Sequence, residues 1–338
     1  MLLMVTNRKK IGEKFGDEEK FNKKYDYQYA YNKLQRGNDA FEKIGKKGFE
    51  VALLKELTRL KDEEGINTPK VGIYVHGFNN NYQDSIDELF DLEKNLSKIN
   101  GYSPVIIGFS WPSSGRVTHY LSDREEVRDS VGAFTRFLLD INELANRNEK
   151  DCFSTSYCIA HSMGNYLLRK GLEYLSDYLG NPRGRMLFDE TILLAADISA
   201  KDIEVEGKGS YIADFSRRVH VYYSKYDRSL KASSVKRFGG SRLGRHGADN
   251  YNNLPRNVIL VDAKQFANKE SASGYKDRSA SQVSVHSIYK YHKDILADVV
   301  QVLSSVDRDQ IKNRERIDSE HASGETWNNH YRLVNENE

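Results

Sequence analysis

The chain has 338 residues, 38% of them hydrophobic, and one domain of this size would bury roughly three quarters of its unfolded surface. Lys and Arg number 51 and Asp and Glu 49, so no field of a single sign would attract nucleic acid or an anionic membrane. The apolar runs fall far short of the ~20 residues that span a bilayer, which predicts a chain without a membrane span.

The start of the chain and its two cysteines indicate the compartment. Residues 2–5 are apolar and precede the basic run 8–10, the reverse of the order in a secretory signal, which predicts a cytoplasmic protein. Cys152 and Cys158 lack the spacing and neighbouring histidines of a metal site, so we expect buried, unreactive thiols; one disulfide is the alternative. No phosphate loop or dinucleotide-binding pattern occurs, and we expect neither a metal nor a cofactor.

Short runs rich in Val, Ile and Tyr alternate with longer segments of helical period. The expected strands are residues 2–6, 71–76, 105–111, 156–160, 191–196, 220–223 and 258–261. The expected helices are residues 51–61, 83–99, 125–147, 163–179, 230–237 and 287–305. This alternation is typical of an α/β fold, in which a mostly parallel central sheet carries helices on both faces as a three-layer sandwich.

We expect residues 1–305 to form one domain. Three polar segments fall outside the alternation: 9–48, a possible cap or surface insertion; 207–218; and 238–256, a polar loop near the site. Any cap would come from these segments, with solvated surface loops as the alternative, and their polarity argues against a long-chain lipid substrate. The highly charged residues 306–338 predict a mobile tail or one loosely docked helix.

Ser162 is the most informative residue of the chain. It lies between a run of strand formers and a run of helix formers, with the small residues Ala160 and Gly164 on either side. Small residues let a strand and a helix pack closely while the chain reverses and the hydroxyl stands clear, which is the pattern of a nucleophile elbow. The sequence predicts a nucleophilic serine; a buried helix-capping serine is the alternative.

A serine nucleophile needs a base, and an imidazole base needs a carboxylate that holds its tautomer. His286 follows the last expected strand and directly precedes the last expected helix, whereas His292 falls within that helix. Asp227 and Asp197 each follow an expected strand, and either could reach the imidazole. Helix capping is the alternative role for Asp227, and a capping or surface role for His286.

Two backbone N–H groups must also point to where negative charge develops on the substrate. Met163, directly after the serine, supplies one, and we expect Phe78 to supply the other, because Gly77 lets the chain turn there. The remaining pocket candidates are His76, Gly77, Asn79, Trp111 and His161. A core side chain beside Pro112 is the alternative role for Trp111.

Seven short segments spread over the chain match a known family when they are taken together. They are Thr6-Asn7-Arg8, His76-Gly77-Phe78, Ser110-Trp111-Pro112-Ser113, Ala160 to Gly164, Ala196-Asp197, Tyr223-Ser224 with Asp227, and His286. Together they resemble the α/β-hydrolase superfamily and, more narrowly, a bacterial family of uncharacterised α/β-hydrolase-like proteins. The resemblance covers residues 1 to about 305 and implies the α/β-hydrolase fold. In that fold the order serine, acid, histidine favours Asp227 over Asp197.

The resemblance implies a serine hydrolase that cleaves a carboxylic ester or related acyl bond of a small molecule (EC 3.1.1) through an acyl-enzyme. An acyltransferase, thioesterase or amidase would use the same residues. A non-catalytic binding or regulatory protein on the same scaffold is the alternative from another class.

Overall fold

The computed structural model describes residues 2–12, 14–19, 26–31, 41–43, 45–67, 69–147, 154–179, 186–236, 240–317 and 329–335. The strands of its main sheet are β1 (Leu2–Thr6), β4 (Asp26–Tyr31), β5 (Phe41–Lys43), β6 (Lys70–Val75), β7 (Val105–Ser110), β8 (Ser154–His161), β9 (Phe188–Leu194), β10 (Ser216–Tyr223), β11 (Val258–Asp262), β12 (Arg314–Arg316) and β13 (His330–Leu333). Among the described residues these form one 11-stranded sheet in the order β12-β13-β11-β10-β9-β8-β6-β7-β1-β4-β5. A separate hairpin pairs β2 (Arg8–Ile11) with β3 (Lys14–Glu19).

The sheet is parallel from β13 through to β1, and antiparallel pairs occur only where β12, β4 and β5 join its two ends. All seven strands expected from the sequence are present. Their continuous apolar runs have a physical reason, since a parallel sheet covered on both faces buries every side chain of its central strands.

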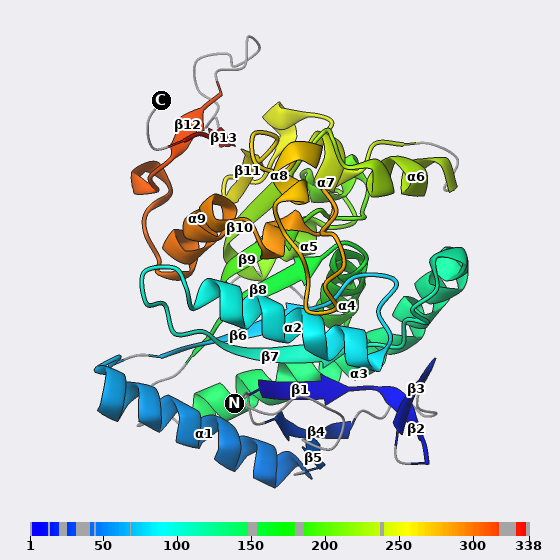
Figure 1. The fold of residues 1–338 in the computed structure, drawn as a ribbon, viewed down its shortest axis with the longest axis vertical. Helices are drawn as coiled ribbons and strands as arrows, with labels where there is room; N and C mark the ends of the chain where they lie inside the picture. The colour runs from blue at the N-terminus through cyan, green and yellow to red at the C-terminus, as the bar shows by residue number, and fades with distance from the viewer. Residues whose placement is uncertain are drawn as a thin grey trace.

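Helices cover both faces (Figure 1). The longer ones are α1 (Gly45–Glu64), α2 (Tyr82–Leu96), α3 (Tyr120–Arg147), α4 (Gly164–Leu179), α6 (Arg228–Lys236) and α9 (Lys293–Leu303). Val71, Ile73 and Val75 of β6 pack with α1, α3 and α4, whereas Tyr74 packs with α2 and α9 on the other face. Alternate residues of one strand thus enter two cores, and the predicted three-layer α/β arrangement is confirmed.

Short helices fill the loops at the strand ends. They are α5 (Ser210–Asp214), α7 (Leu243–His246), α8 (Lys269–Ser273) and the 3₁₀ helices η3 (Val117–His119), η4 (Ala200–Ile203), η5 (Tyr251–Asn253), η6 (Ile288–Lys290) and η7 (Arg308–Gln310).

The last helix differs from the prediction of one helix over 287–305. Residues 288–290 form the separate turn η6, and α9 begins only at Lys293. His292 has an extended backbone (φ −72°, ψ 123°), and its ring nitrogen accepts the N–H of Asp294, so it caps α9. The apolar periodicity continues across this break, and the cap could not be read from it.

In the described residues 306–317 and 329–335, the C-terminal segment also differs from the predicted mobile tail or docked helix. Strands β12 and β13 extend the sheet beyond β11, and Tyr331 and Leu333 are buried there. The guanidinium of Arg314 donates to both carboxylate oxygens of Asp298 at 2.6 and 2.7 Å, with both side chains buried. This ion pair fastens β12 to α9.

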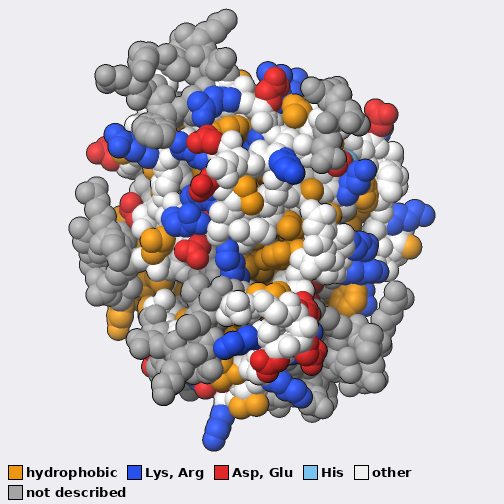
Figure 2. Space-filling view, turned by 90° about the vertical axis from the view of Figure 1, so that its left-hand side faces the viewer, with side chains coloured by type: hydrophobic (Ala, Val, Ile, Leu, Met, Phe, Trp, Pro, Cys, Tyr) orange, Lys and Arg blue, Asp and Glu red, His pale blue; other side chains and the backbone are white. Residues whose placement is uncertain are grey.

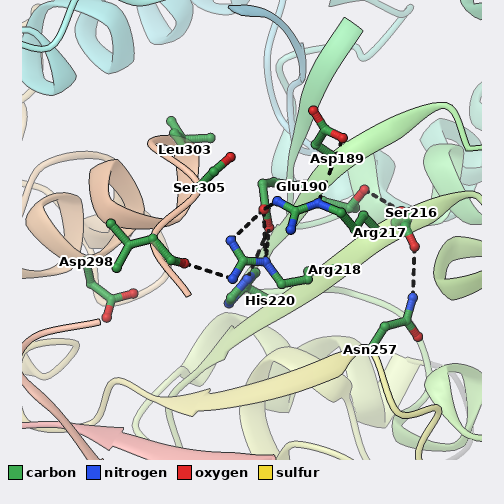
Figure 3. Close-up of polar contacts among 12 residues, drawn as sticks. Asp189, Glu190, Ser216, Arg217, Arg218, His220, Asn257, Asp298, Leu303 and Ser305 are labelled. Carbon is green, nitrogen blue, oxygen red and sulfur yellow. Dashed lines mark hydrogen bonds and ion pairs between the residues drawn. The ribbon is translucent and has the colours of Figure 1, made fainter. Parts of the chain in front are cut away.

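A second charge cluster, built around the buried carboxylate of Glu190, lies near the amino ends of β9 and β10 (Figure 3). Glu190 accepts hydrogen bonds from Arg217 and Arg218 at 2.5 and 2.6 Å, and His220 Nε2 lies 3.3 Å from the same carboxylate. Arg218 also donates to the carbonyl of Val306 at 2.8 Å, which ties the segment after α9 to the sheet. The cluster is at the opposite end of these strands from Ser162.

The surface carries charges of both signs, interspersed over much of the face drawn in Figure 2. Among the described helices, none is long and apolar enough to cross a membrane. Cys158 is buried and unpaired, whereas Cys152 lies outside the described residues. No group of His, Cys, Asp or Glu side chains in the described ranges is arranged to hold a metal ion.

Candidate active site

Ser162 follows β8 and precedes α4 in a sharp turn. Its φ is 53°, in the left-handed region that a serine rarely adopts. A Cβ on Gly164 would lie only 2.4 Å from the carbonyl oxygen of Val75, so α4 can approach β6 this closely only with glycine at that position. The small residue that the sequence analysis associated with an elbow therefore has a direct steric reason.

Asn165 supports the turn and was missed by the sequence analysis. It is fully buried, and its side-chain amide donates to the carbonyls of Ala160, Ser162 and Leu194 at 3.0, 3.1 and 3.3 Å. One side chain thus connects the end of β8, the elbow and the end of β9. The available signal was a polar amide on the face of α4 that is otherwise apolar.

Three predicted residues come together in one hydrogen-bonded chain. His286 Nε2 lies 2.7 Å from Ser162 Oγ, and His286 Nδ1 lies 2.6 Å from Asp227 Oδ2. The other carboxylate oxygen of Asp227 accepts the N–H of Leu230 at 3.0 Å, so the residue caps α6 and holds the histidine at once. Burial opposes the charged imidazole, but the Asp227 carboxylate outweighs it and raises the pKa of His286.

Asp197, the alternative acid, is placed differently. Its carboxylate accepts hydroxyl hydrogen bonds from Tyr120 at 2.7 Å and from Ser233 at 2.6 Å. Its backbone N–H donates to the carbonyl of Ser162 at 3.1 Å. Asp197 therefore braces the elbow and orients two hydroxyl groups, whereas Asp227 is the carboxylate bonded to His286.

The turn after β6 lies directly against the elbow. A Cβ on Gly77 would sit 3.0 Å from Ser162 Cβ, so Gly77 permits the close approach of the two loops. Neither the amide of Phe78 nor that of Met163 donates a hydrogen bond to any residue that the structure describes. Both N–H groups thus lack a hydrogen-bond acceptor among the described residues.

Three of the five pocket candidates, His76, Gly77 and Trp111, do not line the cavity. His76 and Trp111 are buried behind the site rather than lining it, with their rings stacked at a centroid distance of 5.1 Å. The indole N–H donates to the carbonyl of His76 at 2.9 Å, and the ring Nε2 of His76 accepts the N–H of Trp111 at 3.1 Å. These contacts fix the end of β6. Asn79 and His161 do line the cavity.

Arg8 connects two of the segments that carry the resemblance, Thr6-Asn7-Arg8 and Ser110-Trp111-Pro112-Ser113. It is fully buried, and its guanidinium donates to Ser110 Oγ at 3.0 Å, to the carbonyl of Ser113 at 3.1 Å and to the carbonyl of Asn80 at 2.8 Å. Arg8, at the start of β2, therefore ties the end of β7 to the loop that carries Phe78.

A cavity of about 600 Å³ opens beside Ser162. Its walls come from α2, α6, η6 and residues 277–287. The three segments from which a cap was expected, 9–48, 207–218 and 238–256, contribute no lining residue in the described part of the chain. Residues 277–285 were not predicted to line the cavity, because their serines are typical of an ordinary surface loop.

A second hydrogen-bonded group lines the cavity, and its members Glu88 and Lys290 were not predicted from the sequence. Lys290 Nζ lies 2.8 Å from a carboxylate oxygen of Glu88 and 3.4 Å from Nδ1 of His161. The other ring nitrogen of His161 lies 2.9 Å from the carbonyl oxygen of His286. Charged residues in helical segments are usually solvated, so nothing in the pattern indicated that Glu88 and Lys290 pair in the interior.

Known proteins resemble this chain in several ways. An uncharacterized protein of Nostoc sp. (strain PCC 7120), alr1448, is 32% identical over 158 residues, which cover 39% of this chain and 40% of that protein. This chain thus matches about two fifths of the length of its relative.

Solved structures resemble the chain only distantly. Aspergillus fumigatus lipase B is 13% identical, with a TM-score of 0.41 over 71% of this chain and 53% of the lipase. Trichoderma reesei cutinase is 11% identical, with a TM-score of 0.31 over 75% of this chain and 88% of the cutinase. Esterase B of Lactobacillus rhamnosis is 12% identical, with a TM-score of 0.34 over 72% and 79% of the two chains. Likeness at this level says nothing of activity or substrate.

One family matches residues 54–284, which span most of the chain and include Ser162 and Asp227 and end just before His286. The chain belongs to this family, which is described as "Alpha/beta hydrolase of unknown function (DUF900)".

Proposed function

We propose that the protein is a serine hydrolase that cleaves a carboxylic ester or related acyl bond of a small molecule (EC 3.1.1). The observation that carries the proposal is the chain of two short hydrogen bonds, 2.7 Å from Ser162 to His286 and 2.6 Å from His286 to Asp227. It occurs at a strained elbow of a hydrolase fold, where a serine that lines the cavity and its base are both in place.

In the proposed reaction, Ser162 Oγ attacks the acyl carbon while His286 Nε2 takes its proton. Asp227 keeps the Nδ1 proton of His286 in place and stabilises the imidazolium. The N–H groups of Phe78 and Met163 donate hydrogen bonds to the oxyanion. These hydrogen bonds strengthen as negative charge develops in the tetrahedral intermediate. His286 then protonates the leaving group. In the second half of the reaction, His286 takes a proton from water, the water attacks the acyl carbon, and His286 returns the proton to Ser162 Oγ as the acid leaves.

The cavity favours a small, polar acyl compound. Phe78 and Leu230 offer apolar contact, but much of the wall is polar or charged, including Glu88, Lys236 and Lys290. Such a wall suits a substrate with its own hydrogen-bonding groups better than a long alkyl chain. A thioester or amide, or an alcohol acceptor in place of water, would use the same residues.

Active-site labelling with a fluorophosphonate tests the proposal, together with turnover of a panel of p-nitrophenyl esters. We expect wild-type protein to be labelled and Ser162→Ala and His286→Ala to lose labelling. Asp227→Asn should label far more slowly, because the imidazole loses its orienting carboxylate. Asp197→Asn is the matched control, since this buried carboxylate adjoins the elbow without bonding to His286, and it should keep most of the labelling rate.

Folded wild-type protein that neither labels nor hydrolyses any ester would contradict the proposal. A ligand-binding protein on the hydrolase scaffold would then be the better description. Thermal unfolding of each variant has to accompany the labelling, so that loss of reactivity is separated from loss of fold.

A further inference from the structure

Glu88 is the meeting point of groups from three elements that surround the candidate site. It projects from α2 into the cavity with 13% of its side chain exposed. One carboxylate oxygen accepts hydrogen bonds from Asn80 at 3.0 Å and from Lys290 at 2.8 Å. The other accepts the hydroxyl of Tyr74 in β6. Burial opposes the charged carboxylate, but the Lys290 ammonium and the Tyr74 hydroxyl outweigh it and hold the pKa of Glu88 well below its usual range.

Lys290 and His161 connect Glu88 to the loop that carries His286. An ammonium can only donate, so Lys290 makes Nδ1 of His161 the acceptor and leaves the ring proton on Nε2. That N–H donates to the carbonyl of His286 at 2.9 Å. Burial and the nearby Lys290 charge keep the pKa of His161 well below its usual value, so the ring stays neutral and keeps this tautomer.

Asn80 connects Glu88 to the loop that carries Phe78. Asn80 lies two residues after Phe78, its backbone N–H donates to Ser113 Oγ at 3.2 Å, and its carbonyl accepts from Arg8. The side-chain bond to Glu88 is the third fixed point of the loop. The preceding residue, Asn79, has a φ of 64°, a left-handed conformation that such contacts have to maintain.

We infer that Glu88 is a positioning residue. It holds the loop of Phe78 through Asn80 and the loop of His286 through Lys290 and His161, and so keeps the two loops in a fixed position relative to each other. The inference rests on the proposed function. Glu88 makes no hydrogen bond to Ser162 or to the imidazole of His286 within the described residues, so it acts through the groups it binds. Its effect should therefore appear in the rate of reaction of bound substrate rather than in affinity.

The experiment compares Glu88→Gln with the double variant Glu88→Gln/Lys290→Met. The single variant keeps the shape of the side chain and loses its charge, which leaves Lys290 buried without its counter-ion. The double variant removes both charges, and replacing a buried ion pair by uncharged groups is often neutral for stability. Glu93→Gln is the matched control, because Glu93 is a buried glutamate of the same helix that does not line the cavity.

The readouts are kcat and KM for the best p-nitrophenyl ester, the rate of fluorophosphonate inactivation, and thermal unfolding. We expect Glu88→Gln to lower kcat and the inactivation rate by about ten- to hundredfold, with KM within about threefold, since small displacements of reacting groups have effects of this size. The double variant should regain the wild-type melting temperature but not kcat. Glu93→Gln should react like wild type.

Two results would overturn the inference. One is folded Glu88→Gln with kcat and inactivation rate within twofold of wild type. The other is a double variant that regains wild-type kcat, because Glu88 would then only neutralise Lys290. If Glu88→Gln does not fold, the double variant decides alone. Both results are measured against wild-type protein that reacts. An unreactive wild-type protein is a different outcome, and it would contradict the proposed function and this inference together.

Discussion

Replacing Gly164 by alanine tests whether the elbow depends on the close approach of two backbones. The added Cβ would lie 2.4 Å from the carbonyl oxygen of Val75, the last residue of β6, and 2.6 Å from that of His76, the residue after it. To reach an ordinary contact of 3.4 Å, α4 and the end of β6 have to separate by about 1 Å. That end of β6 leads directly into Gly77 and Phe78, so the separation acts on the proposed oxyanion site.

Both effects have expected sizes. Overpacking of this kind costs about 1–3 kcal/mol of folding free energy. A chain of 338 residues has an unfolding entropy of roughly 0.7 kcal/mol/K, so the melting temperature should fall by about 1–4 °C. Misplacement of the oxyanion donors by about 1 Å should lower kcat by about a hundredfold.

Gly171→Ala is the matched control, since it makes the same change in the same helix. Its Cβ would meet the ring of Phe134 at 2.7 Å, far from the elbow, and we expect a comparable loss of stability with kcat unchanged. Differential scanning calorimetry and steady-state kinetics measure the two quantities. Gly164→Ala with wild-type kcat, or an equal loss of kcat in Gly171→Ala, would refute the reasoning.

Two further predictions concern pH and the C-terminal strands. The neutral imidazole of His286 is the reactive form, and Asp227 raises its pKa above the ordinary 6.5, so kcat/KM should fall as pH decreases through a value above 6.5. In Asp227→Asn this acid limb should move to lower pH; a limb that stays in place would contradict the assignment. Arg314→Met leaves Asp298 buried without its cation, at a cost of about 3–5 kcal/mol, so the melting temperature should fall by about 4–7 °C with kcat unchanged. A change below 1 °C would show that this pair does not fasten β12.

The sequence predicted those parts of the molecule that depend on local pattern. Continuous apolar runs identified the central strands, and small residues around Ser162 identified the turn, because both features follow from what lies next to them in the chain. The order of serine, acid and histidine that the resemblance implies favoured Asp227 over Asp197, and the position before the last expected helix favoured His286 over His292.

What the sequence could not predict depends on pairs far apart in the chain. Glu88 and Lys290 are separated by 202 positions, and only the fold shows that each neutralises the other in the interior. Strand β13 is short and half polar, and its place in the sheet depends on pairing with β11 rather than on its own composition. The helix break at His292 depends on a side-chain cap within an unbroken apolar pattern.

The elbow itself shows how such distant contacts maintain a strained residue. The left-handed backbone of Ser162 costs about 1–3 kcal/mol. Its N–H donates to Leu194, and its carbonyl accepts from the amides of Asn165 and Asp197 and from the side chain of Asn165. Four hydrogen bonds at about 0.5–1.5 kcal/mol each offset the strain. Because these bonds come from β9, α4 and the loop after β9, the turn is held before any ligand arrives. The hydroxyl therefore meets His286 without a conformational change, which is the condition that the proposed attack requires.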